Sequence, residues 1–207
     1  MSEIDVLKTA IERHCITRHP QGIPLNSGGI GYYYLDLKGV TLHPRYARVI
    51  GELMAPTIVE SGAEAVGGLA AGCIPIADAV ARAALDGGRV LPTFFGRAEA
   101  KDHGPKDKDR LRQAVAEDEG PLVRPGRRVA IVEDAVTQGG AAMQATQFAL
   151  DEGCDVVLVM CVVERHEGGG ARFRERGIPF KRLFYTDEDG SLYVDDDVAA
   201  RAGVASK

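Results

Sequence analysis

Short apolar runs alternate with helix-like segments along most of the chain, and this alternation limits the fold more than any other feature of the sequence. Strands are expected where apolar residues stand together, at residues 32–37, 64–68, 90–95, 128–134, 156–164 and 180–185. Helices are expected at residues 3–14, from Pro44 onward, and at 74–85, 141–150 and 171–176, with Pro56 ending or kinking the second. The alternation predicts an α/β protein with a central, mainly parallel sheet flanked by helices.

Length and composition set broad limits on the function. The 207 residues fit one domain, and 45% hydrophobic with 27% charged residues is typical of a globular protein. A net charge of −5 argues against nucleic acid as a main partner. We expect no membrane partner, because no apolar run is long enough to span a bilayer and the N-terminus lacks a signal-peptide core. Four cysteines without Cys-x-x-Cys spacing predict reduced thiols in a cytoplasmic protein.

Residues 129–141 carry the most functional information. An apolar strand leads into Glu133 and Asp134, and a Thr/Gly loop then opens an Ala-rich helix. The loop amides and the helix N-terminus can bind a phosphate, with a hydroxyl donor from Thr137, and Gly139 and Gly140 let the backbone approach the ligand. The two carboxylates would repel a phosphate, so we expect them to face sugar hydroxyls or a magnesium ion. The segment therefore predicts a site for a phosphorylated sugar, against the simpler interpretation of an ordinary strand–turn–helix.

Three further segments follow or precede expected strands and are expected at the same cleft. Residues 94–104 carry the potential cations Arg97, Lys101 and His103, which a solvated charged loop would also explain. Residues 162–169 place Arg165 at a strand end, where it could bind a planar anion or form a structural salt bridge. Tyr33 and Tyr34 are candidates for stacking on a base, and strand alternation places one of them in the core or an interface.

A glycine-rich turn at residues 67–77 follows the strand expected at 64–68. Such a turn can present backbone amides to a pyrophosphate, although a tight turn alone would explain the same residues.

Together these motifs resemble those of the orotate phosphoribosyltransferases, a family of type I phosphoribosyltransferases, in family order over residues 20–186. The resemblance implies a single type I phosphoribosyltransferase domain, residues 1–207. Its parts would be an N-terminal helix and hood (1–40), a core (41–186) that includes a mobile catalytic loop (96–126), and a loosely packed acidic tail (187–207).

The resemblance also implies a reaction. The enzyme would transfer the 5-phosphoribosyl group of 5-phosphoribosyl 1-pyrophosphate (PRPP) to orotate, giving orotidine 5′-monophosphate and pyrophosphate in pyrimidine biosynthesis. Mg²⁺ would be bound mainly through PRPP, with no dedicated protein metal ligands. A homodimer would share the catalytic loop across its interface.

The same resemblance assigns roles to particular residues. The catalytic residues would be Lys101, His103 and Asp134. The base would contact Arg165, Tyr33, Tyr34 and Thr137. The PRPP-binding residues would be Arg97, Lys101, His103, Glu133, Asp134, Ala135, Thr137, Gln138, Gly139, Gly140 and Ala141.

Several positions depart from the family pattern. Ala98 and Gly72 stand where many members have lysines, Asn26 replaces a lysine or serine, and Gln138 and Ala141 replace small or hydroxyl residues. These changes leave two alternatives open: a phosphoribosyltransferase for a different base, or a non-catalytic PRPP-binding regulator.

About ten extra residues in 105–120 are a further departure. Leu111 and Val115 have a spacing that fits a short helix. The charge lost at Ala98 could be replaced by one of the basic residues of this segment, Lys106, Lys108, Arg110 or Arg112.

Overall fold

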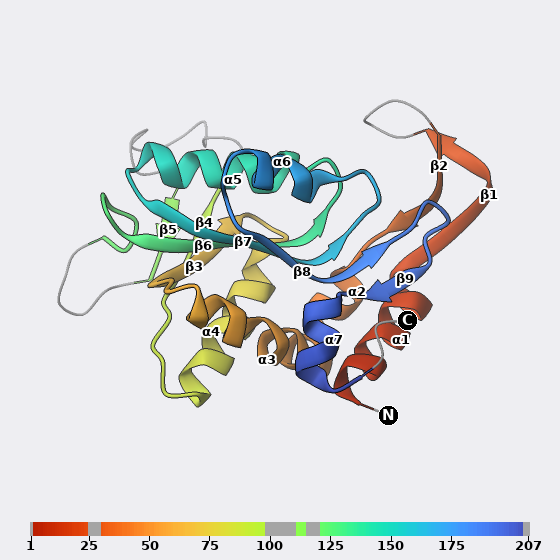
Figure 1. The fold of residues 1–207 in the computed structure, drawn as a ribbon, viewed down its shortest axis with the longest axis horizontal. Coiled ribbons are helices and arrows are strands. Elements are labelled where there is room, and N and C mark those ends of the chain that lie inside the picture. The colour runs from red at the N-terminus through yellow and green to blue at the C-terminus, as the bar shows by residue number, and fades with distance from the viewer. Residues whose placement is uncertain (1, 25–29, 98–110, 115–120, 205–207) are drawn as a thin grey trace.

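A seven-stranded sheet forms the centre of the molecule (Figure 1). The computed structural model describes residues 2–24, 30–97, 111–114 and 121–204. The strands lie in the order β5-β4-β3-β6-β7-β8-β9, in which β3, β4, β6, β7 and β8 run parallel and the two edge strands run antiparallel to their neighbours. Their bounds are β3 Ala65–Leu69, β4 Thr93–Gly96, β5 Leu111–Gln113, β6 Arg128–Val136, β7 Asp155–Glu164, β8 Phe180–Thr186 and β9 Leu192–Val194.

Helices cover both faces of this sheet, which confirms the predicted α/β class (Figure 1). Helices α5 (Gly140–Asp151) and α6 (Gly169–Glu175) cover one face, and α1 (Glu3–His14), α3 (Pro44–Glu60), α4 (Cys73–Asp86) and α7 (Asp196–Ala202) lie on the other. Each face buries its own apolar cluster, and the larger cluster lies on the side of α3 and α4.

A two-stranded antiparallel ribbon, β1 (Ile16–Pro24) with β2 (Ile30–Leu35), stands beside the β8–β9 edge of the sheet (Figure 1). Alternation along β2 buries Tyr33 and exposes Tyr32 and Tyr34, as a strand requires. The strand ends at Leu35, earlier than predicted, because Leu37 already caps the short helix α2 (Lys38–Thr41).

Helix α3 shows that packing can override a proline. The sequence predicted that Pro56 ends or kinks this helix. The helix does not end there, since α3 continues to Glu60 with Pro56 inside it. Pro56 is exposed, while Met54, Ala55 and Ile58 around it are buried in the larger apolar cluster. Burial of that face stabilises the last turn despite the missing amide.

The C-terminal segment corrects a second expectation, that residues 187–207 pack loosely. Strand β9 pairs with β8, and Leu192, Val194 and Val198 are buried. Asp195 caps α7 with its side chain and accepts a hydrogen bond from Arg182 Nε at 2.9 Å. The prediction rested on the acidic composition of this segment. It missed the three-residue strand β9, which has two buried apolar positions, and the seven-residue helix α7.

The described parts of residues 96–126 also differ from expectation. Leu111–Gln113 is strand β5 on the free edge of β4, so the helix predicted from Leu111 is wrong there, and Val115 lies outside the described residues. Leu122 and Val123 are buried, and Val123 N donates to Gln113 Oε1 at 2.8 Å. The described ends of the segment predicted as a mobile loop therefore pack onto the sheet.

None of the helices within the described residues is long and apolar enough to cross a membrane.

Candidate active site

The predicted site lies where the strand order changes direction. From β3 the chain continues through α4 to β4 on one side, and from β6 it continues through α5 to β7 on the other side. The carboxyl ends of β3 and β6 therefore open onto a crevice with no crossover helix above it, the usual ligand position in such sheets. The glycine-rich turn after β3 and the Thr/Gly loop after β6 both lie at this edge of the sheet.

The acid pair of β6 lies at this crevice. Pairing of Val136 with Glu164 extends β6 two residues beyond its predicted end, so Glu133 and Asp134 lie within the strand. Glu133 is buried and its Oε1 accepts a hydrogen bond from Asp134 N at 3.1 Å, whereas Asp134 is half-buried. Burial, together with the charge of Asp134, raises the pKa of Glu133 from 4.5 to about 8. Glu133 is therefore mainly protonated at neutral pH in the absence of ligand.

The turn after β3 touches the acid pair directly. A methyl group placed on Gly72 would lie 2.6 Å from Glu133 Oε1 and 3.1 Å from Asp134 Oδ1. Glycine therefore lets the turn backbone lie against the carboxylates. A side chain here would require the Glu133 carboxyl to move.

The loop after β6 has the shape expected of a phosphate site. Gly139 adopts φ +82°, which glycine tolerates best, and caps α5. Thr137, Gly140 and Ala141 are exposed, so the N-terminus of the twelve-residue α5 is open to a ligand. Arg172 Nη1 donates to the Gln138 carbonyl at 3.0 Å and fixes the outer side of the loop.

Arg165 follows β7 and is tied to the same loop through its backbone. Its amide donates to Val136 O at 2.8 Å, and Gly169 N donates to Thr137 O at 2.9 Å. The buried guanidinium donates from Nε to the Tyr33 hydroxyl at 3.1 Å, and its Nη2 lies 3.3 Å from Glu167 Oε1. The structural salt bridge considered from the sequence is therefore present, together with a position at the crevice.

The two tyrosines occupy different environments. Tyr33 is fully buried, so its ring has no exposed face on which a base could stack. Tyr34 is 54% exposed and stays the candidate for stacking. Sequence reasoning identified the alternation but not that Tyr33, rather than Tyr34, faces inward.

Part of the predicted site lies outside the described residues: Lys101, His103, Asn26, Ala98, Lys106, Lys108 and Arg110. Arg97 is described and is half-buried directly after β4, at the same end of the sheet. Ala135 is half-buried within β6.

Two residues at the crevice were missed from the sequence. Thr186, at the end of β8, places its hydroxyl 2.7 Å from that of Tyr33, and no local motif marks it. Lys38 pairs with Asp36 at 3.1 Å, and its pKa is raised by the hydrogen bond to Asp36, by the charge of Asp36 and, to a smaller extent, by the charge of Asp134. The signal for Lys38 was a basic residue two positions after an aspartate, which is too common to single out.

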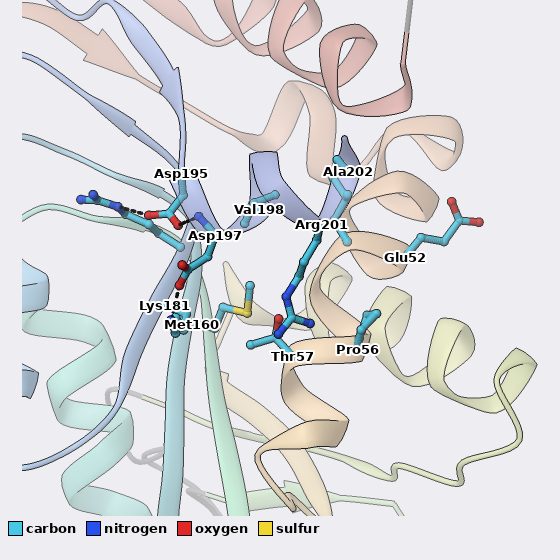
Figure 2. A pocket seen from close by; sticks show the side chains of 12 residues that line it. Glu52, Pro56, Thr57, Met160, Lys181, Asp195, Asp197, Val198, Arg201 and Ala202 are labelled. Carbon is cyan, nitrogen blue, oxygen red and sulfur yellow. Dashed lines mark hydrogen bonds and ion pairs between the residues drawn. The ribbon is translucent and has the colours of Figure 1, made fainter. Parts of the chain in front are cut away.

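A separate pocket of about 280 Å³ lies between α3, β8 and α7 (Figure 2). No residue of the predicted site lines it. Its cations already have partners: Lys181 pairs with Asp197, Arg182 with Asp195, and Arg201 with Glu60. The pairs of Asp195 and Asp197 drawn in Figure 2 thus attach the start of α7 to β8, and the pair of Arg201 with Glu60 attaches α7 to α3.

Three features define the class as a type I phosphoribosyltransferase fold. They are the strand order of the sheet, the β1–β2 ribbon beside its edge, and the crevice at Glu133, Asp134 and the loop after β6. No protein-family model matches the chain. The orotate phosphoribosyltransferase of Bradyrhizobium diazoefficiens is 34% identical over 166 residues, 80% of this chain and 86% of that protein. That of Aquifex aeolicus is 39% identical over 164 residues, 79% of this chain and 84% of that protein.

Solved structures agree with these relatives. Orotate phosphoribosyltransferase of Mycobacterium tuberculosis, in complex with Fe(III) dicitrate, matches with a TM-score of 0.70 at 30% identity, covering 87% of this chain and 94% of that one. The same enzyme in complex with PRPP matches with a TM-score of 0.67 at 28% identity and the same coverage. The chain belongs to the orotate phosphoribosyltransferase family, whose members are pentosyltransferases.

Proposed function

We propose that the protein transfers the 5-phosphoribosyl group of PRPP to orotate, giving orotidine 5′-monophosphate and pyrophosphate in pyrimidine synthesis. One observation carries this proposal: the phosphate loop after β6 and the Arg165 turn after β7 are hydrogen-bonded to each other at Val136 and Thr137. The acid pair precedes that loop by a few residues. A phosphate, a ribose and an anionic base therefore each have suitable groups along one crevice.

PRPP would bind with its 5-phosphate in the loop of Thr137, Gln138, Gly139, Gly140 and Ala141, next to Ala135. The open α5 N-terminus and the loop amides supply donors there. Glu133 and Asp134 would accept hydrogen bonds from the ribose hydroxyls, and the proton held by Glu133 can be displaced or donated as those bonds form. Arg97 would contact the diphosphate from the β4 side.

Magnesium fits this site as part of the PRPP complex. The described residues contain no group of three or more histidine, cysteine or acidic side chains placed to hold a metal ion. Two adjacent carboxylates suit Mg²⁺ that keeps waters and diphosphate oxygens among its ligands. Glu133 and Asp134 would contact the ion directly or through water, and the ion would supply charge neutralisation on the diphosphate.

Catalysis would consist of positioning and electrostatic stabilisation. The family mechanism has a loose transition state with cationic character at ribose C1. Asp134 would lie beside the ribose and would stabilise that charge. Lys101 and His103, outside the described residues, would bind the departing pyrophosphate, and a closed loop would exclude water that could hydrolyse PRPP.

We also propose a cytoplasmic homodimer that shares the catalytic loop. Support comes from a groove of about 460 Å³ between α3 and α4, in which exposed Leu42 and other apolar side chains lie among charged ones such as Arg48 and Asp78. Subunits carrying Lys101→Ala or Asp134→Asn should be inactive alone. Mixed and re-equilibrated, they should regain about one quarter of wild-type activity, since half the dimers are hybrids with one intact site. No recovery would indicate that each loop serves its own subunit.

The reaction itself is tested by mixing protein with PRPP, magnesium and orotate, and following loss of orotate absorbance together with pyrophosphate release. Turnover that Lys101→Ala abolishes would support the proposal. PRPP binding without orotate turnover would contradict it. A panel of uracil, other pyrimidines and purines would then separate an enzyme for another base from a non-catalytic regulator.

A further inference from the structure

Polar groups from three distant parts of the chain meet at the Tyr33 hydroxyl. Its oxygen lies 2.7 Å from Thr186 Oγ1, 3.1 Å from Arg165 Nε and 3.2 Å from His166 Nδ1. Tyr33 belongs to the hood strand β2, Thr186 ends β8, and the other two residues follow β7. The buried Tyr33 side chain thus joins the hood to the crevice.

The donors and acceptors of this cluster are mutually consistent. Arg165 Nε can only donate, so the Tyr33 oxygen must accept from it. The one Tyr33 proton then goes to Thr186 or to His166, and the remaining group can donate back. Because Tyr33 and Thr186 are buried, removing one partner would leave a polar group without compensation.

The cluster fixes the plane of the Arg165 guanidinium. Nε is held by the Tyr33 hydroxyl, and the guanidinium carbon lies 4.5 Å from the centre of the same ring. Nη2 is buried and has no hydrogen-bond acceptor within the described residues, although it lies in ion-pair range of Glu167. A guanidinium held at Nε presents its terminal nitrogens to a carboxylate in a defined direction.

The C-terminal turn holds the other side of the Tyr33 ring. A methyl group on Gly190 would lie 2.6 Å from Tyr33 Cγ, so the β8–β9 turn packs directly on the ring. Asp187 closes that turn by accepting hydrogen bonds from Ser191 N at 2.8 Å and from the Tyr193 hydroxyl at 3.0 Å. Tyr33 is therefore fixed between this turn and Arg165.

We propose that Tyr33 is a positioning residue for base recognition: its hydroxyl, supported by Thr186 and His166, orients the Arg165 guanidinium toward the carboxylate of the base. Tyr33 does not touch the base in this role. The inference rests on the proposed function, in which Arg165 binds the carboxylate of orotate.

The test compares two nucleotides that differ only in that carboxylate, orotidine and uridine 5′-monophosphate, by isothermal titration calorimetry on the full-length protein. Tyr33→Phe keeps the ring and removes the hydroxyl. It should weaken orotidylate binding about tenfold, the effect expected for one hydrogen bond to a charged group. Uridylate binding should change by less than about twofold, since the phosphate contacts stay in place. Tyr32→Phe, a hydroxyl deletion on the opposite face of β2, should leave both affinities unchanged.

Each outcome has a separate meaning. Wild-type protein that binds both nucleotides equally would overturn the proposed function and the role of Tyr33 with it. Wild-type discrimination that survives Tyr33→Phe, or equal loss of both affinities, would overturn the positioning role alone. If Tyr33→Phe fails to fold, Thr186→Val removes a partner of the hydroxyl with little change in shape, and it should lower the orotidylate preference in the same direction.

Discussion

Burial of the Glu133 carboxyl beside Asp134 raises its pKa from 4.5 to about 8. The titration of Glu133 therefore makes the free energy of unfolding depend on pH. Between these values the unfolded chain ionises Glu133 while the folded protein keeps the proton. Rising pH therefore favours unfolding across this window, and the penalty is constant above about pH 8. Below pH 4.5 both states are protonated and the penalty is absent.

Glu133→Gln should remove this penalty. We expect its free energy of unfolding to exceed that of wild type by roughly 1–3 kcal/mol at pH 8.5, with the difference vanishing as the pH approaches 4.5. Urea denaturation at several pH values measures this, with Glu12→Gln on the exposed face of α1 as control. A variant less stable than wild type at every pH would show that the buried carboxyl contributes favourably. Turnover should fall, because an amide, unlike the Glu133 carboxyl, cannot give up its proton when the ligand binds.

At the scale of elements, the contact between α3 and α4 depends on Gly51. A methyl group there would lie 2.3 Å from the carbonyl oxygen of Ala79, a backbone atom that cannot rotate away. Gly51→Ala should therefore destabilise the protein by about 2 kcal/mol or more, although alanine is the better helix former by about 1 kcal/mol. Gly87→Ala is the control, since its methyl group would approach Ala84 O only to 3.4 Å. Guanidinium denaturation of both variants distinguishes packing from propensity.

The C-terminal elements allow a similar comparison. Leu192 in β9 is 3% exposed, whereas the Arg201 side chain on α7 is about half exposed in its ion pair with Glu60. Leu192→Ala should cost about 2–5 kcal/mol, and Arg201→Ala no more than about 1 kcal/mol. Thermal unfolding monitored by circular dichroism measures both. Comparable small losses would mean that the tail contributes little to the fold.

These elements also show what the sequence could predict. Helix α1 was predictable because Ile4, Leu7 and Ile11 recur at helical spacing, and the structure buries this face. Strands β5 and β9 were not, because three residues carry almost no periodicity and each strand exists through hydrogen bonds to a neighbour, β4 or β8. Packing decided the end of α3 in the same way.

The site likewise contains residues that the sequence could predict and residues that it could not. Glu133, Asp134 and the Thr137–Gly140 loop form one continuous segment, so their proximity followed from a single strand–loop–helix unit. The partners of Tyr33 lie 132, 133 and 153 residues away in sequence, and only the folded chain brings them together. The buried position of Tyr33 therefore had no local signature.

At the scale of the whole molecule, the cysteines report on global unfolding. All four, in the described part of the chain, are free and buried. Burial raises the pKa of Cys73 to about 12 and that of Cys15 to about 11, so neither forms a thiolate at neutral pH. Native protein should resist iodoacetamide at pH 8 for hours and react fully in denaturant, as intact mass spectrometry would show. Rapid labelling of one native cysteine would reveal local opening near it.

The hydrogen bonds that join the Arg165 turn to the phosphate loop have a consequence for ligand size. Gly169 packs so closely on Thr137 O, 2.4 Å from where its methyl group would lie, that the two segments cannot slide apart without breaking contacts. The distance from the phosphate loop to the backbone of Arg165 is therefore fixed by the main chain, and in the proposed complex only the Arg165 side chain, held by Tyr33, adds reach toward the base. A ligand of matching length gains the second contact at high effective concentration, and one that is a bond too long or too short binds by one end only. If the proposed contacts form, selection by length would thus follow largely from the main chain.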